Sequence, residues 1–301
     1  MIFNIHQITT STTLEQISAL IKKQKIDIHQ MGVFKDIACK IALIQNTISP
    51  KLNKPKHYIL SLNSEKNEQY LKTDETSLIN NFNNTNLLEV HIIEIEKQNN
   101  LTLKSIDFDQ YKKGLDMGIE ISLQAFNSGS NCISFGTTHN ESNIAASLLT
   151  AEITNSTIEE CTYFNPNISE QEQKNNLEKI IAKKAMYSPM TLADIMCDYG
   201  QLDIITIVGG ILKAAELGMV ILIDSFTVSS ALLFAHQLNE NVIDYCIFCN
   251  QSNNKGHQVI IDYFEKKTIL NLDYGTDIGL GIPITLPIIN GSITWLKNAL
   301  K

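Results

Sequence analysis

The sequence has no excess of basic residues. Lys and Arg together number 24 against 32 for Asp and Glu, which gives a formal net charge of −8. A nucleic-acid-binding surface needs clustered positive charge, so we expect no nucleic-acid partner. Apolar residues make up 44% of the 301 positions and charged residues 19%, which excludes disorder and collagen-like structure as the main interpretation.

Long apolar runs are also missing. The longest, 218–223 and 278–289, are too short or too rich in Gly and Pro to span a bilayer as a helix, so no membrane interaction is expected. Residues 1–12 lack the basic start and the apolar stretch of a signal peptide. A cytoplasmic location is the resulting expectation.

The sequence contains no metal or cofactor motif of a standard kind. The seven histidines are scattered, and neither H-E-x-x-H nor a second C-x-x-C occurs, so no metal site is predicted. There is no P-loop, G-x-G-x-x-G or G-x-S-x-G either, and no cofactor is expected. The single C-x-x-C, Cys246 and Cys249, lies in an apolar run. We therefore predict reduced core thiols rather than disulfides.

Helical and strand-like segments alternate along most of the chain. Helical spacing of apolar residues predicts two helices within residues 12–50. A polar, Asn-rich stretch, 63–86, separates two short strand-like runs. The strand-like runs are 57–62, 88–95, 132–135, 220–223 and 245–248. The later ones are nearly continuous apolar runs, typical of parallel strands covered on both faces. The predicted fold is α/β, with a doubly wound, mainly parallel, Rossmann-like sheet.

Ligands of such sheets bind at the carboxyl ends of the strands, so the loop after Phe135 is the first candidate. It offers small polar residues at a helix N-terminus, where a phosphate or carboxylate is stabilised. The simpler alternative is that these residues only cap the helix. The candidates are Gly136, Thr137, Thr138, Ser142 and Asn143.

Two further loops follow the strands that end at Ile223 and Phe248. Asp224 either orients a substrate hydroxyl or holds a helix turn. The next loop contains Ser252, Gly256 and His257, of which the imidazole is capable of acid–base chemistry but is equally consistent with a structural role.

A glycine-rich segment, 273–283, precedes the last apolar run. Glycines such as Gly279 and Gly281 allow the backbone to come close to a ligand or to turn tightly. Asp277 is the carboxylate of this segment that we select as a candidate base, with a turn residue as the alternative.

The second half of the chain contains several segments that match a known family. Residues 200–212, which include Asp203, and 218–233 resemble the segments GG-x-E-I-A-A-x-x-G and P-V-x-x-D-G-F-x-x-x-A-A-A-L-L. These segments are typical of the nicotinate-nucleotide:dimethylbenzimidazole phosphoribosyltransferases, the CobT type, which the chain resembles. Residues 252–257 are similar to that family's S-x-E-x-G-H, and 136–149 lie where its G-E-M-G-I-G-N-T-T-x-A-A-A-L-L is expected. The resemblance covers about residues 28–300.

The resemblance implies transfer of phosphoribose from nicotinate mononucleotide to a benzimidazole nitrogen, giving the α-ribazole phosphate of the cobalamin lower loop. The family's base is a glutamate in the C-terminal loop, and this chain has Ile278 at that position, directly after Asp277. A second motif glutamate corresponds to Thr137. The resemblance also departs from the family's motifs at 60–64, 74–78 and 161–165.

The resemblance further implies a homodimer and two domains. Residues 1–50 with 285–301 are expected to form a small helical domain, and 51–284 a large α/β domain with the ligand site. The residues implied in phosphate or ligand binding are Gly136, Thr137, Thr138, Ser142, Asn143, Asp203, Asp224, Ser252, Gly256, His257, Gly279 and Gly281.

Two functional hypotheses remain open. In the first, the chain is a divergent phosphoribosyltransferase in which Asp277 replaces the family's base. In the second, it is a non-catalytic or repurposed paralogue that binds a nucleotide, a benzimidazole-like ligand or another protein. An Asp277 side chain that points outward and caps a turn would favour the second.

Overall fold

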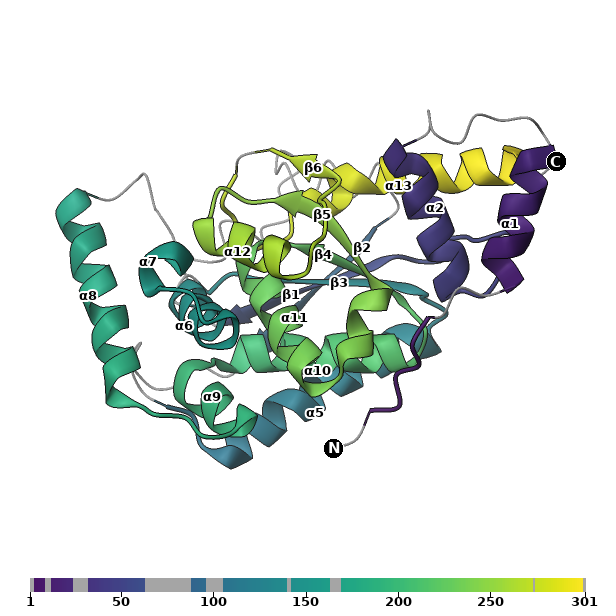
Figure 1. The fold of residues 1–301 in the computed structure, drawn as a ribbon. Coiled ribbons are helices and arrows are strands. Elements are labelled where there is room, and N and C mark those ends of the chain that lie inside the picture. Colours follow the sequence, from purple (N-terminus) through teal and green to yellow (C-terminus); the bar gives the residue numbers. More distant parts are fainter. Residues whose placement is uncertain are drawn as a thin grey trace, which may run out of the picture.

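A six-stranded sheet runs through the centre of the computed structural model (Figure 1). The structure describes residues 3–8, 12–23, 32–62, 88–95, 105–139, 142–162, 169–272 and 274–299. Every strand pairing is parallel, in the order β2-β1-β3-β4-β5-β6. The strands are β1 Lys56–Leu62, β2 Glu89–Ile95, β3 Cys132–Thr137, β4 Val220–Asp224, β5 Cys246–Gln251 and β6 Leu270–Asn271. The predicted α/β fold with a doubly wound parallel sheet is therefore confirmed.

The three central strands are buried along almost their whole length, as their apolar runs predict. All residues of β3 and β4 are buried, and in β5 only Gln251 at the end is partly exposed. Both thiols of the C-x-x-C are completely buried, and all six cysteines are free. The prediction of reduced core thiols holds for Cys246 and Cys249, whereas Cys39 and Cys197 are only partly buried.

Helices connect the strands and cover the sheet. Those that follow β1 and β2 in the chain are α5 Phe108–Asn127, α6 Ser142–Thr154, α7 Ile158–Cys161, α8 Glu170–Met186, α9 Leu192–Tyr199, α10 Leu202–Glu216, α11 Phe226–Leu238, the 3-10 helix η2 Glu240–Tyr245, α12 Lys255–Tyr263 and α13 Gly281–Ala299. Two of them, α5 and α10, lie against each other along one side of the sheet (Figure 1), and α11 packs against α10 and α6.

The N-terminal helices α1 Thr12–Lys23 and α2 Gly32–Ile44 lie beside α13, at the far end of the molecule from α8 (Figure 1). A second small apolar cluster there joins Ile17, Ala38, Ala42 and Leu296. The two predicted N-terminal helices are present. The boundary placed at residue 285 falls within α13, and the division into two domains stays a prediction.

Strand order reverses between β1 and β3, because β2 lies on one side of β1 and all later strands lie on the other. Such a switch point opens a crevice at the carboxyl ends of the strands. The loops that follow β3, β4 and β5 all leave the sheet at this edge. The Asn-rich stretch, 63–86, lies outside the described residues.

Within the described part of the chain, no helix is both long and apolar enough to cross a bilayer. Those same residues contain no group of three His, Cys, Asp or Glu side chains placed to hold a metal ion.

Candidate functional site

The C-terminal loop docks onto the end of β3. The backbone N–H of Thr137 donates to the carbonyl oxygen of Asp277 over 2.8 Å. A Cβ atom at Gly136 would lie 2.7 Å from the carbonyl carbon and oxygen of Ile278, so only glycine permits this approach. The loop before α13 is thereby brought to the candidate loop after β3.

Asp277 points inward, toward the start of α11. Its Oδ1 accepts the backbone N–H of Thr227 over 3.1 Å. Burial raises the pKa of the Asp277 carboxyl group, although the Thr227 N–H and the side chains of Ser225 and Asn143 oppose this shift. The side chain is therefore not the outward turn cap that would favour a non-catalytic protein.

Asp224 forms the reciprocal contact with α13. It is completely buried, and its Oδ2 accepts the N–H of Gly281 over 2.8 Å and the hydroxyl of Tyr274 over 3.1 Å. A Cβ at Gly281 would lie 2.6 Å from Asp224 Oδ1. Asp224, which precedes α11, thus binds the first residue of α13, whereas Asp277, which precedes α13, binds α11.

The residue between Asp224 and α11 has an unusual backbone conformation. Ser225 has φ of 73°, a left-handed conformation that is unusual for a residue with a side chain. It is the residue before α11 and makes no side-chain capping bond. Of the two roles expected for Asp224, holding a helix N-terminus fits this contact, although the helix is α13, through the N–H of Gly281, rather than α11.

The charge of Asp277 affects the ionisation of Asp224. Burial and, less strongly, the nearby charge of Asp277 together raise the pKa of Asp224 to about 7, against the opposing hydrogen bonds from Gly281 and Tyr274. A buried acid that titrates near neutral pH, beside a second acid in the same cluster, is a common arrangement for proton transfer.

The raised pKa of Asp224 predicts that its contribution to the free energy of unfolding falls as pH rises from about 4 to 7. The folded protein keeps a proton on Asp224 that the unfolded chain, with a usual pKa of 3.8, releases, so each pH unit costs about 1.4 kcal/mol. Asp277 contributes in the same direction. His57 and His257, whose pKa values are lowered by burial, act in the opposite direction below about pH 6.5, so the prediction is a difference between two proteins. In chemical denaturation at several pH values, the stability of the wild type relative to Asp224→Asn is expected to fall by about 1.4 kcal/mol per pH unit. A difference that does not change with pH would contradict the raised pKa.

Asp203 holds the loop after β3. Its Oδ2 accepts the hydroxyls of Thr137 over 2.7 Å and Ser142 over 2.5 Å, and it is almost completely buried at the start of α10. Thr138 donates its hydroxyl to Ser61 over 3.3 Å. Thr137, Thr138 and Ser142 of the candidate phosphate loop are therefore held by neighbouring side chains, and Asn143 lies beside Asp277.

His257 and Ser252 form a second fixed loop. His257 Nδ1 accepts the backbone N–H of Ser252 over 3.0 Å, so Nε2 carries the proton and donates to Ser229, also over 3.0 Å. Burial lowers the pKa of this imidazole to about 3, and Gly256 lies against the ring of Phe226. Both ring nitrogens are engaged by the protein, which favours the structural role for His257.

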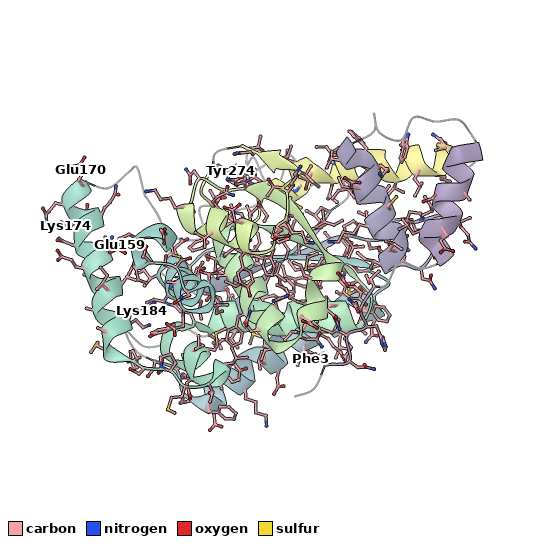
Figure 2. All side chains as sticks on the ribbon, in the orientation of Figure 1. Phe3, Glu159, Glu170, Lys174, Lys184 and Tyr274 are labelled. Atoms are coloured by element: carbon pink, nitrogen blue, oxygen red, sulfur yellow. The ribbon has the colours of Figure 1, made fainter. Side chains whose placement is uncertain are left out.

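Sequence patterns missed three residues of this site. His57 binds the carbonyl oxygen of Ile278, and Tyr274 binds Asp224 near β6 (Figure 2). Asn250 is 1% exposed, and its Oδ1 accepts the N–H of Leu272 over 2.9 Å. Its Nδ2 has no partner among the described residues. The position of Asn250 at the end of a buried strand was the only available signal.

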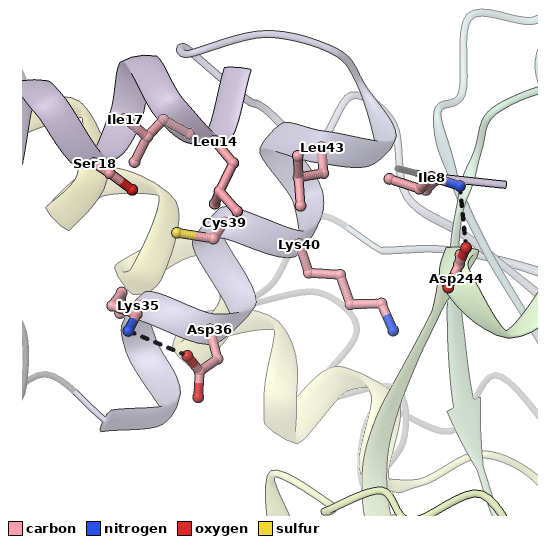
Figure 3. Close-up of a pocket in the computed structure, with 10 residues that line it drawn as sticks. All are labelled: Ile8, Leu14, Ile17, Ser18, Lys35, Asp36, Cys39, Lys40, Leu43 and Asp244. Atoms are coloured by element: carbon pink, nitrogen blue, oxygen red, sulfur yellow. Dashed lines mark hydrogen bonds and ion pairs between the residues drawn. The ribbon is translucent and has the colours of Figure 1, made fainter. Parts of the chain in front are cut away.

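A pocket of about 500 Å³ lies away from this cluster, among α1, α2 and the 3-10 helix η2 (Figure 3). Its wall combines apolar side chains with Lys40, whose Nζ donates to the carbonyl of Ile243 over 3.3 Å. Asp244 accepts the N–H of Ile8 over 3.0 Å. None of the predicted site residues lines this pocket; the lining side chains are Ile8, Leu14, Ile17, Ser18, Lys35, Asp36, Cys39, Lys40, Leu43 and Asp244.

Comparison with known proteins relates this geometry to one family. The chain is 24% identical to a nicotinate-nucleotide–dimethylbenzimidazole phosphoribosyltransferase of Janthinobacterium sp. (strain Marseille), covering 94% of this chain and 92% of the relative. It is also 24% identical to the enzyme of the same name from Parabacteroides distasonis, covering 89% of this chain and 88% of that relative.

A solved structure has the same fold. The crystal structure of CobT from Thermus thermophilus matches with a TM-score of 0.85 at 16% identity, over 95% of this chain and 96% of that chain. The family model DBI_PRT, described as a phosphoribosyltransferase, matches residues 80–300. The chain therefore belongs to the DBI_PRT phosphoribosyltransferase family, as a distant member that is related over most of its length to the nicotinate-nucleotide–dimethylbenzimidazole enzymes.

Proposed function

We propose that this protein transfers phosphoribose from nicotinate mononucleotide to a ring nitrogen of a benzimidazole-like acceptor, with Asp277 as the general base. The observation that carries the proposal is the direction of Asp277: its carboxyl group lies among the strand ends, bound to the N-terminus of α11. Its raised pKa brings its basicity nearer to the operating pH, which suits a general base.

The chemistry needs one proton acceptor and one anion site. The azole nitrogen attacks the C1′ carbon of the ribose while the bond from C1′ to the nicotinate nitrogen breaks, and nicotinate leaves with the bonding pair. The azole N–H proton goes to the Asp277 carboxylate. We place the phosphate at the loop after β3, where Thr137 and Thr138 precede the 13-residue helix α6 and Ser142 is its first residue, because helix N-termini stabilise anions.

The experiment is a coupled measurement of both products. Purified protein with nicotinate mononucleotide and 5,6-dimethylbenzimidazole is expected to release nicotinate and form α-ribazole phosphate in equal amounts. Release of nicotinate must depend on the azole. Release without the azole product would indicate hydrolysis and contradict the proposed transfer.

A second candidate function, ligand binding without turnover, is favoured by Ile278. Its apolar side chain stands where the resemblance places the family's base, and Asp277 already accepts a backbone N–H. Thermal unfolding separates the two candidates. Under both, a ligand at 100 times its dissociation constant adds about 2.7 kcal/mol to the free energy of unfolding, and only the first also forms product.

We also propose that the protein acts as a homodimer in the cytoplasm, in line with the resemblance. Light scattering on the purified chain is expected to give twice the 33.7 kDa of one chain. A mass of one chain at micromolar concentration would contradict the proposed dimer.

A further inference from the structure

His57 links the sheet to the C-terminal loop from a buried position in β1. Its side chain is 1% exposed, and its partner in the neighbouring strand is Ser134. Its Nδ1 lies 2.8 Å from Ser134 Oγ, and its Nε2 lies 2.8 Å from the carbonyl oxygen of Ile278. A carbonyl oxygen only accepts, so Nε2 carries the proton and Nδ1 accepts the serine hydroxyl.

The loop is shaped to receive this ring. Gly279 has φ of 82°, and a Cβ there would lie 2.6 Å from His57 Nε2. On the other side, the carbonyl oxygen of Asp277 accepts the N–H of Thr137. Two consecutive carbonyl groups, those of Asp277 and Ile278, are therefore fixed by separate donors, and this determines the direction in which the Asp277 side chain leaves the backbone.

We propose that His57, oriented by Ser134, is a positioning residue that fixes the segment 277–279 so that the Asp277 carboxyl group stays at the N-terminus of α11. Where it concerns turnover, this inference rests on the function proposed above. His57 does not contact the reacting atoms in this scheme. Its role is to keep the base within reach of the azole nitrogen.

The imidazole of His57 keeps one protonation state while the acids of the site titrate. Burial lowers the pKa of its imidazole to about 4, although the backbone groups of Ile278 and Ser134 oppose this shift. The ring therefore stays neutral throughout the range in which Asp224 titrates. Its hydrogen bonds do not change when the acids of the site gain or lose protons.

The decisive variant is His57→Phe, which keeps a ring of similar size and removes the donor to Ile278. We expect kcat to fall about 100-fold, as for a base displaced by about 1 Å, with KM changed less than about threefold. His57→Gln, which has an amide donor, is expected to recover part of kcat. His236→Phe is the matched control, because His236 lies on α11 against Phe264 and Tyr263, and it should keep wild-type kcat.

A second readout needs no substrate. Hydrogen exchange at the amides of Thr137 and Thr227, which donate to the backbone and side chain of Asp277, is expected to be at least about tenfold faster in His57→Phe. Wild-type exchange at both amides would overturn the proposal even if kcat falls. If the wild type has no transferase activity, the proposed function fails, and exchange still decides the positioning role.

Should His57→Phe fail to fold, Ser134→Ala replaces it in the same measurement. Loss of the serine hydroxyl removes the partner that selects the Nε2–H form of His57. We expect exchange at the amides of Thr137 and Thr227 to be faster than in the wild type, by a smaller factor than in His57→Phe. Unchanged exchange in Ser134→Ala would likewise overturn the proposal.

Discussion

Asp277→Asn is expected to reduce phosphoribosyl transfer by about 100-fold or more in kcat, which is the usual loss when a general base is removed. The fold should remain, because an asparagine oxygen still accepts the N–H of Thr227 and no buried charge is left behind. Initial rates of nicotinate release test the expected loss of kcat, and melting temperatures test whether the fold remains.

Asp109→Asn is the matched control for this variant. Asp109 is an exposed acid in the first turn of α5 and makes none of the site contacts described above, so its replacement should leave both the rate and the melting temperature unchanged. Wild-type turnover in Asp277→Asn would remove Asp277 from the mechanism.

The second large effect concerns stability. Gly118 in α5 faces α10, where an added Cβ would lie 2.5 Å from the backbone nitrogen of Gly210 and 2.9 Å from the carbonyl carbon of Thr206. Ser122 also donates to the carbonyl of Gly210 over 2.8 Å. Backbone atoms cannot rotate away, so the helices must separate.

Gly118→Ala is therefore expected to lower the free energy of unfolding by about 3 kcal/mol, since overpacking outweighs the gain of about 1 kcal/mol in helix propensity. Urea denaturation checks this value. Gln124→Ala, on the exposed face of α5, is expected to change stability by less than about 0.5 kcal/mol. Equal stabilities for the two variants would contradict the close packing of α5 and α10.

The sheet could be predicted from local patterns because its central strands are short apolar runs flanked by polar loops. Apolar runs at 132–135, 220–223 and 245–248 predicted β3, β4 and β5 to within a few residues. The two-residue strand β6 and the short helix α7 carry too few residues for a periodic signal. The inward position of Asp277 was also beyond sequence patterns, because it depends on a contact with Thr227, 50 positions earlier.

The candidate loops were predictable for a different reason. Parallel strands bring their carboxyl ends to one edge, so the positions of Gly136, Asp224 and Asp277 near one another follow from topology. The hydrogen-bond partners of these residues do not follow from topology. Asp224 binds the first residue of α13, 57 positions later in the chain. His57 is the second residue of β1, and its neighbours in sequence give no sign of its contact with Ile278.

The most direct test of the proposed site is a crystal structure of the protein with nicotinate mononucleotide and 5,6-dimethylbenzimidazole, or with their product. We expect the azole ring at the carboxyl ends of β3 and β4, with a ring nitrogen within about 3 Å of an Asp277 carboxyl oxygen. An azole bound in the pocket beside Cys39 and Lys40, or separated from Asp277 by the side chain of Ile278, would contradict the proposed base.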